Sequence, residues 1–222
     1  MARVSGGEHP QVIFLDAVGT LFGVAGSVGQ QYGYVARQFG AIVDDSRLNR
    51  EFFKAFKAAP PCVFPGVTGE ELPEREWKWW RAIALQTFEA AGVREQIKDF
   101  DAFFQELYEY FATPAPWFLY PDTKPTLQIW QGLGIELGVI SNFDTRLYRV
   151  LKDLELVDFF QGITLSTEVG AAKPNPLVFE AALHRHRCEP GSAMHIGDSF
   201  EDDYLGAKGV GIQARWLKRT QP

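Results

Sequence analysis

The chain has 222 residues, of which 46% are hydrophobic and 23% are charged, a balance typical of a globular protein with one sizeable core. Its formal charge of -6 disfavours a surface that follows a nucleic-acid backbone, because such surfaces concentrate Lys and Arg. The sequence has no apolar run of membrane-spanning length, and its two cysteines, Cys62 and Cys188, lack paired spacing. We therefore expect a cytoplasmic protein with free thiols that binds neither nucleic acid nor membrane.

The first predicted element is a buried strand over residues 12–15, where a short apolar run ends at Asp16 before a glycine-containing turn. From Ser27 to Phe111 the pattern changes to long segments at helical spacing, broken by Pro60-Pro61 and Gly92. This stretch predicts an insertion made only of helices.

After the insertion, strands alternate with helices. We predict strands at residues 137–140, 162–165, 193–196 and 211–214, and helices that begin at Asp144, Pro176 and about Phe200. Such alternation predicts an α/β fold whose parallel sheet is Rossmann-like and covered on both faces. Residues 1–23 and 115–222 would form this core, and residues 24–114 would form the helical cap.

Polar residues follow three of the predicted strands, where the ligands of parallel sheets bind. Asp16-Ala17-Val18-Gly19-Thr20, Ser141-Asn142, Lys173-Pro174 and Gly197-Asp198 through Asp203 resemble, in this order, the four motifs of the haloacid dehalogenase superfamily. The resemblance extends over nearly the whole chain. Residues 16–22, 77–92 and 139–144 also look like the branch named for the rhythmically expressed gene product. The resemblance to the superfamily implies a hydrolase whose helical cap closes over the site.

The resemblance assigns a role to each motif. Asp16 would be the nucleophile that forms an aspartyl phosphate, and Thr20, Ser141, Asn142 and Lys173 would complete the catalytic set. Mg²⁺ would bind the carboxylates of Asp16 and Asp198 and the backbone carbonyl of Val18. Asp203 would orient the waters of the metal or the ammonium group of Lys173. The expected substrate is a phosphorylated small molecule.

Val18 departs from the pattern of the superfamily's phosphatases. An Asp normally stands there, where it protonates the leaving oxygen and later activates water, and general acid-base help of this kind typically accelerates a reaction by about a hundred- to ten-thousand-fold. Three explanations are compatible with the sequence. The leaving group needs no acid, as in acyl or aryl phosphates; another group supplies the proton; or the protein binds phosphorylated ligands in a regulatory role with weak or no turnover.

Two related chemistries also tolerate a non-acidic residue at this position. Haloacid dehalogenases carry a Tyr in place of Val18 and need no metal, whereas Gly197-Asp198 favours a metal site. Phosphonatases use a cap lysine as a Schiff base, a role for Lys54 or Lys57 if either were desolvated. We expect a Mg²⁺-dependent phosphatase. The sequence does not specify its substrate or its oligomeric state.

The predicted cap is rich in aromatic residues, most of which we expect in its core. Helical spacing places Phe52 and Phe56 on one face, and Trp77 and Trp80 on another. One or two rings would line the pocket or a subunit contact. Four cap arginines would contact a second anionic group of the substrate or form surface ion pairs: Arg37, Arg50, Arg75 and Arg81. We interpret His195 as a buried structural residue.

Overall fold

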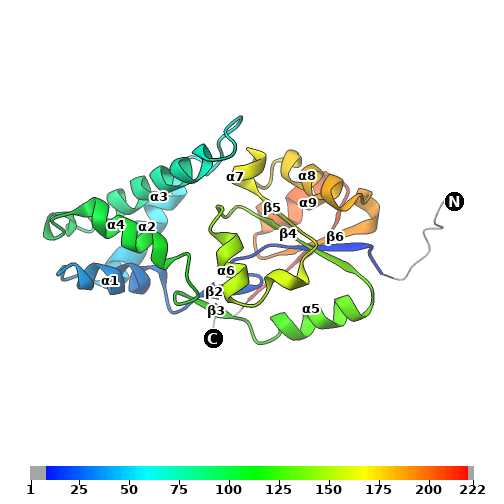
Figure 1. Cartoon of the computed structure of the whole chain (residues 1–222), viewed down its shortest axis with the longest axis horizontal. Coiled ribbons are helices and arrows are strands. Elements are labelled where there is room, and N and C mark those ends of the chain that lie inside the picture. The colour runs from blue at the N-terminus through cyan, green and yellow to red at the C-terminus, as the bar shows by residue number, and fades with distance from the viewer. Residues whose placement is uncertain (1–8, 220–222) are drawn as a thin grey trace.

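A computed structural model describes residues 9–219 and places them in two adjoining parts, a sheet covered by helices and a cluster of helices (Figure 1). The sheet contains five strands, all parallel, in the order β5-β4-β1-β6-β7. This confirms the α/β fold with a parallel sheet. The strand bounds are β1 Val12–Leu15, β4 Glu136–Ser141, β5 Gly162–Leu165, β6 Ala193–Gly197 and β7 Gln213–Trp216.

Side chains of β1 alternate between two hydrophobic cores. Ile13 and Leu15 pack with residues of α5 and α6 on one face, whereas Val12 and Phe14 pack with α8 and α9 on the other. Because β1 is buried on both faces, all four of its residues are apolar. The bounds of the helices that cover the sheet are α5 Thr123–Gly132, α6 Leu147–Asp153, α7 Ser166–Val169, α8 Pro176–His186 and α9 Gly206–Gly209.

Two predicted boundaries differ from the structure. Helix α6 begins at Leu147 rather than at Asp144, because the Asp144 carboxylate accepts a hydrogen bond from the Arg146 backbone and holds a turn there. Strand β7 begins at Gln213 rather than at Gly211, whose φ of +84° belongs to a turn. A π-helical turn, Phe200–Leu205, precedes α9, and short 3₁₀ helices span Arg94–Gln96, Val157–Phe159 and Pro190–Ser192.

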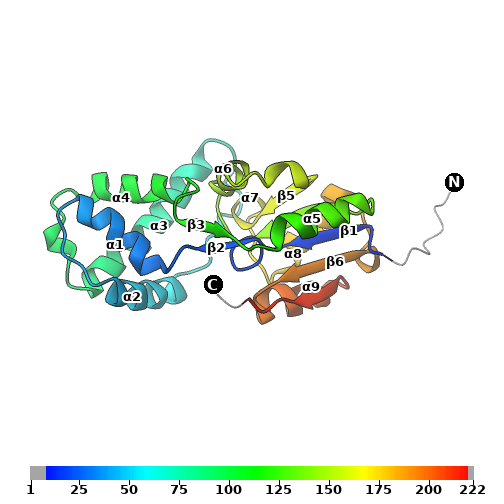
Figure 2. The ribbon, with the colours of Figure 1, turned by 90° about the horizontal axis from the view of Figure 1, so that it is seen from below.

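A two-stranded antiparallel ribbon joins the two parts, a feature that the sequence analysis did not predict. Strands β2 (Phe22–Val24) and β3 (Trp117–Leu119) pair with each other, so the chain leaves the core and returns to it side by side (Figure 2). The four helices α1 to α4 lie between these two strands in the sequence. The start and the end of the segment that contains these helices therefore lie beside each other, where the ribbon joins the core.

The helical cluster, hereafter the cap, has its own aromatic core. Phe88, Phe103 and Phe104 are buried in it, with ring centroids of Phe88 and Phe103 4.9 Å apart. Side chains of Ser27, Asp44 and Asp99 accept hydrogen bonds from the first turns of α1, α2 and α4, which fixes where these helices begin. The helix bounds are α1 Val28–Gln38, α2 Asp45–Ala58, α3 Glu71–Ala90 and α4 Phe100–Tyr110.

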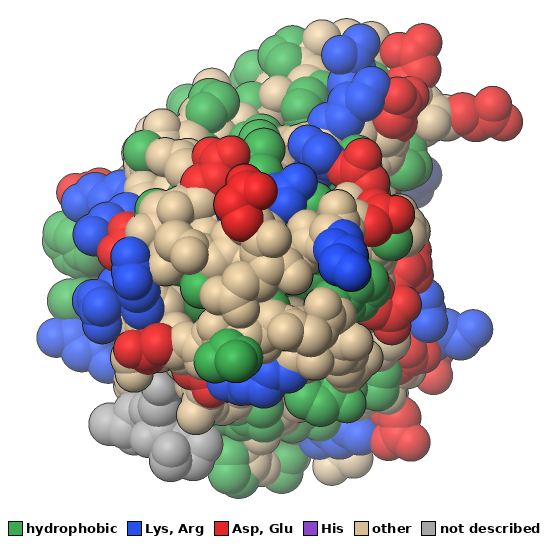
Figure 3. Space-filling model, turned by 90° about the vertical axis from the view of Figure 1, so that its left-hand side faces the viewer, with side chains coloured by type: hydrophobic (Ala, Val, Ile, Leu, Met, Phe, Trp, Pro, Cys, Tyr) green, Lys and Arg blue, Asp and Glu red, His purple; other side chains and the backbone are tan. Residues whose placement is uncertain are grey.

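Seen from the cap end, acidic and basic side chains occupy the same face together with scattered hydrophobic ones (Figure 3). The two ion pairs Arg37–Asp45 and Arg81–Asp101 join neighbouring cap elements. These two arginines therefore belong to surface pairs. None of the helices within residues 9–219 has the length and apolar character that crossing a membrane requires.

Candidate active site

A buried lysine links two of the carboxylates that the motifs predicted. Nζ of Lys173 lies 2.6 Å from Oδ1 of Asp16, at the end of β1, and 2.6 Å from Oδ1 of Asp203, in the π-helical turn. It also donates to the carbonyl of Ile140 at 3.0 Å. All three ionic side chains are at least nine-tenths buried. The Lys173 ammonium is thereby held against the proposed nucleophile.

Asp198 completes an oxygen-rich cluster beside Asp16. Carboxylate oxygens of Asp16, Asp198 and Asp203 lie within 4.8 Å of one another. Gly19 permits this approach, because a Cβ added to it would lie 2.3 Å from Oδ2 of Asp198. Its φ of +89° also disfavours any other residue there. Hard carboxylate oxygens that converge in this way fit Mg²⁺, and the Val18 carbonyl belongs to the same loop.

Asp203 differs from the other two carboxylates because both of its oxygens accept hydrogen bonds from the protein. Oδ1 accepts hydrogen bonds from Lys173 and from Nε2 of His195, and Oδ2 accepts one from the Ser199 backbone. Gly197 allows this packing, since a Cβ there would lie 2.1 Å from Cγ of Asp203. Asp203 therefore orients Lys173, and His195 is a fully buried partner of Asp203.

The charged groups in this cluster shift one another's pKa values. Burial raises the pKa of Asp16 to about 7, and the nearby Asp203 contributes in the same direction while Lys173 opposes it. Burial would lower the pKa of Lys173, but Asp16 and Asp203 outweigh it and raise that pKa to about 12. Despite its burial, Asp203 has a lowered pKa because of Lys173 and His195. Lys173 is thus a permanent cation.

Of the other predicted catalytic residues, two line the cavity beside Asp16 and one does not. Ser141 is buried at the end of β4 and lines the cavity described below. Asn142 also lines it, but its amide is engaged by Lys173, accepting from the backbone nitrogen at 2.8 Å and donating to the carbonyl at 3.1 Å. Thr20 is 2% exposed and is absent from the cavity wall. Thr20 is therefore buried in the nucleophile loop and does not face the cavity.

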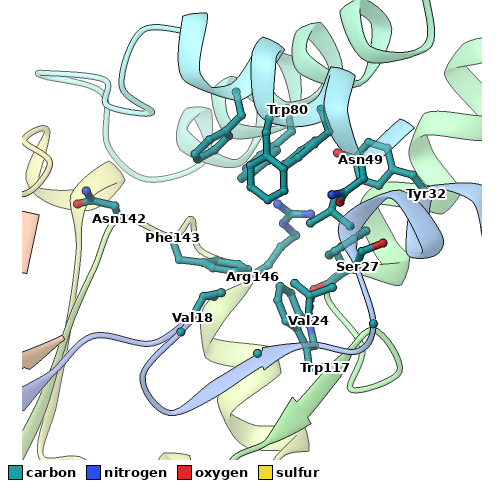
Figure 4. A pocket seen from close by; sticks show the side chains of 18 of the residues that line it. Val18, Val24, Ser27, Tyr32, Asn49, Trp80, Trp117, Asn142, Phe143 and Arg146 are labelled. Atoms are coloured by element: carbon teal, nitrogen blue, oxygen red, sulfur yellow. Dashed lines mark hydrogen bonds between the residues drawn. The ribbon is translucent and has the colours of Figure 1, made fainter. Parts of the chain in front are cut away.

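A cavity of about 640 Å³ opens beside Asp16, between the sheet and the cap. Asp16, Asp198 and Val18 lie on its core side, and aromatic residues of α1, α2, α3 and α4 lie on its cap side. Figure 4 shows Val18 and Phe143 at one side of this space and Trp80 across from them. Lys54 and Lys57 are exposed and do not line the cavity, which does not fit the Schiff-base role of a phosphonatase.

Arg146 is a cavity residue that the sequence analysis missed. Its guanidinium lies among the aromatic rings below Trp80 (Figure 4). It donates to both oxygens of Asp144, at 2.8 and 2.6 Å, and to the carbonyl of Tyr108. The only sequence signal was an Asp and an Arg two residues apart in a predicted helix, a pattern common on protein surfaces.

The fold and site agree with the comparison to known families. A model of the haloacid dehalogenase-like hydrolase family matches residues 10–211. The chain belongs to this family. Haloacid dehalogenase-like hydrolase domain-containing protein 3 of Mus musculus is 34% identical over 208 residues, covering 93% of this chain and 81% of that protein. Rhythmically expressed gene 2 protein of Drosophila melanogaster is 31% identical, covering 90% of this chain and 80% of that protein.

Solved structures of related hydrolases share the fold. The crystal structure of an HAD phosphatase from Thermococcus onnurineus has a TM-score of 0.63 and 25% identity, covering 96% of this chain and 88% of that one. A dehalogenase structure has a TM-score of 0.70 at 16% identity, covering 97% and 87%. The second likeness concerns the fold alone. Neither likeness fixes which reaction this haloacid dehalogenase-like hydrolase performs.

In this hydrolase, the cavity offers few groups that could replace an acid at Val18. Among the described residues that line it, the only carboxyl groups are those of Asp16 and Asp198. Its tyrosines are poor acids, because burial raises the pKa of Tyr32, Tyr108 and Tyr120 above the ordinary value of 10.0. The cavity wall therefore provides no efficient general acid of its own.

Proposed function

We propose that this haloacid dehalogenase-like hydrolase is a Mg²⁺-dependent phosphatase that acts on a phosphorylated small molecule through an aspartyl phosphate. The observation that carries the proposal is the position of Asp16, whose carboxylate faces the cavity beside Asp198 while Lys173 holds it at 2.6 Å. A fixed nucleophile, a buried cation and a hard oxygen cluster are what phosphoryl transfer requires.

Each residue then has a defined task. A carboxylate oxygen of Asp16 forms a bond to phosphorus, while the bond from phosphorus to the leaving oxygen breaks and the leaving oxygen keeps the electron pair. Lys173 fixes Asp16 and contributes positive charge near the transferred group, and Ser141 lies at the same cavity wall. Asp16 and Asp198 would hold Mg²⁺, which would supply positive charge next to the phosphoryl oxygens. A water oxygen then bonds to phosphorus, the bond from phosphorus to the Asp16 oxygen breaks, and inorganic phosphate leaves with the protons of the water, which regenerates the Asp16 carboxylate.

Val18 restricts which substrates this scheme can serve. Without a general acid, the leaving oxygen departs as an anion, and an alkoxide is a poor one. Acyl phosphates and aryl phosphates release stabilised anions and need no proton at that moment. We therefore expect efficient turnover for such compounds and slow turnover for simple alkyl phosphates.

Hydrolysis of acetyl phosphate, with and without Mg²⁺, tests the proposal. The wild-type chain should release phosphate only with Mg²⁺, Asp16→Asn should be inactive, and Glu201→Gln, an exposed acidic neighbour of the site, should behave as wild type. Mass spectrometry of the quenched wild-type reaction should show one added phosphoryl group on the peptide that contains Asp16. Metal-dependent turnover that persists in Asp16→Asn would contradict the assignment of the nucleophile.

The cavity without an efficient general acid also supports a second candidate, a protein that binds a phosphorylated ligand without turning it over. Beryllium fluoride, a mimic of the aspartyl phosphate, separates the two. If the wild-type chain binds beryllium fluoride with Mg²⁺ yet hydrolyses no acyl phosphate, the result supports a protein that only binds its phosphorylated ligand. Binding together with turnover supports the phosphatase.

A further inference from the structure

Eleven of the 25 residues that line the cavity next to Asp16 are aromatic. Tyr32 and Phe52 have ring centroids 5.3 Å apart, Phe52 and Phe56 stack at 5.7 Å, and Phe56 stacks on Trp80 at 5.8 Å. Trp117 and Phe143 continue the lining on the core side, with centroids 5.8 Å apart. Rings in stacked and edge-on arrangements favour a flat, polarisable partner.

Two of these cap rings remain open to the cavity and solvent. Phe53 is 54% exposed and Phe56 is 43% exposed, although both line the cavity. Large apolar side chains that stay exposed around a concave site are typical of ligand-binding surfaces. The cap therefore presents apolar area that a bound molecule can cover.

The charge of Arg146 is already neutralised within the protein. The Asp144 side chain, which is fully buried, binds the guanidinium through two hydrogen bonds, and the ring centroid of Tyr108 lies 3.8 Å from its Cζ. Among the described residues that line the cavity, Arg146 is the only Lys or Arg. A second anionic group on the ligand would face an Arg146 whose charge Asp144 already balances, so the site offers it little net attraction.

The volume sets the size of the ligand. A protein cavity of about 150 Å³ holds one benzene molecule, whereas this cavity measures about 640 Å³. Space thus remains for a phosphoryl group at Asp16 and for a body larger than a single ring. Val18, on the core side, adds an apolar contact and no proton.

From this arrangement we propose that the substrates are aryl phosphates with a fused or linked ring system and no second anionic group. The rings of the substrate lie against Phe52, Phe56 and Trp80, and the phosphoryl group lies at Asp16. This inference rests on the proposed phosphatase function and narrows it. Aryl phosphates account for both features of the site. Their rings fit the apolar lining, and they need no acid at Val18, because an aryl oxygen leaves as a stabilised anion.

Calorimetric binding to the Asp16→Asn variant with Mg²⁺ tests the substrate class without turnover. Naphthyl phosphate should bind at least about ten-fold more tightly than butyl phosphate, because it covers more aromatic surface. Phosphoglycolate, which adds a carboxylate, should bind no more tightly than butyl phosphate. Equal affinity for naphthyl and butyl phosphate, or tightest binding of phosphoglycolate, would overturn the proposal.

Matched cap variants locate the ring site. In the same background, Phe56→Ala should reduce the ratio of naphthyl to butyl phosphate affinity by about five-fold or more, through lost apolar contact. Tyr34→Ala removes a similarly exposed cap aromatic that does not line the cavity, and this ratio should stay unchanged. A ratio that Phe56→Ala leaves intact would reject the aromatic wall as the binding surface.

The two levels of proposal fail separately. Naphthyl phosphate binding that is tight and sensitive to Phe56, combined with no hydrolysis of acetyl phosphate or naphthyl phosphate, would reject the phosphatase and keep the aryl site. Metal-dependent acetyl phosphate hydrolysis without any preference for naphthyl phosphate would do the reverse.

Discussion

The indole nitrogen of Trp80 donates a hydrogen bond of 2.6 Å to Oδ2 of Asp144. Trp80 belongs to cap helix α3, and Asp144 lies in the core loop that follows β4. One turn earlier on α3, Glu76 accepts hydrogen bonds from the backbone and the hydroxyl of Thr145. Two side chains on one face of α3 thus hold the loop that follows Ser141 and carries Asn142 and Arg146.

Replacing Trp80 with Phe tests this connection, because the ring can remain while the N–H group is lost. Asp144 would remain in its buried position, beside Arg146, with one hydrogen-bond donor fewer. We expect the free energy of unfolding in urea to fall by about 1.5–3 kcal/mol, the usual range for a hydrogen bond to a charged group. Trp77→Phe is the control, since its indole donates to the neutral side chain of Gln105 at the surface. Equal losses in the two variants would argue against a special role for Trp80.

Glu76 should make stability depend on pH. Burial raises the pKa of Glu76 above its ordinary value of 4.5, and the charge of Asp144 adds to the effect. The folded chain then binds a proton more readily than the unfolded chain does. Stability from this group is present below pH 4.5 and is lost as pH rises through the raised value.

Urea unfolding of wild type and Glu76→Gln, at about pH 5 and about pH 8, measures this dependence. Wild type should lose stability relative to Glu76→Gln as pH increases. Glu74→Gln is the matched control on the same helix, because Glu74 is exposed and its hydrogen bond to Lys78 lowers its pKa. If the free energy of unfolding changes equally with pH in wild type and in Glu76→Gln, the raised pKa of Glu76 is refuted.

Lys173 should matter for stability as well as for activity. Lys173→Met removes the cation and leaves the buried carboxylates of Asp16 and Asp203 facing each other. We expect a loss of about 3–5 kcal/mol, as when one partner of a buried ion pair is removed. Urea unfolding of Lys124→Met provides the control, since the pair of Lys124 with the exposed Glu155 should contribute at most about 1 kcal/mol.

Addition of Mg²⁺ should stabilise Lys173→Met more than it stabilises wild type, because the metal replaces part of the missing positive charge. Thermal unfolding with and without the metal measures the difference. Identical shifts in the two proteins would indicate that the metal binds elsewhere.

Val18→Asp should restore the missing acid. Formation of the aspartyl phosphate from butyl phosphate should accelerate by about a hundred-fold or more, while its formation from acetyl phosphate, whose leaving group needs no proton, should gain little. Val18→Asn has nearly the same shape without an acidic proton and serves as the control. If Val18→Asn and Val18→Asp give the same rates, proton donation at this position is not what limits the native chain.

The sequence was sufficient to predict the sheet and the residues at its edge. Short apolar runs that end in Asp16, Ser141 and Asp198 indicate buried parallel strands, and the C-terminal ends of such strands meet. The structure brings Asp16, Asp198 and Lys173 together as the motifs led us to expect. Whether they catalyse phosphoryl transfer stays a prediction.

Features formed by contacts between distant segments could not be predicted. Phe22 pairs with Leu119 in the ribbon, and neither neighbouring sequence signals a partner almost a hundred residues away. Arg146 becomes a cavity residue only because Trp80 and Tyr108 are brought over it by cap helices. Periodicity reports which face of an element is apolar, and it does not report which elements meet.

The position of β1 at the centre of the sheet has a consequence for synthesis on the ribosome. Val12 pairs with Glu136 on one side and with Ala193 on the other, so both neighbours of the first strand are made long after it. At about 5–20 residues per second, β1 waits on the order of ten to forty seconds for β6. During that time the helical insertion, whose contacts are mostly local, has already emerged and can assemble first.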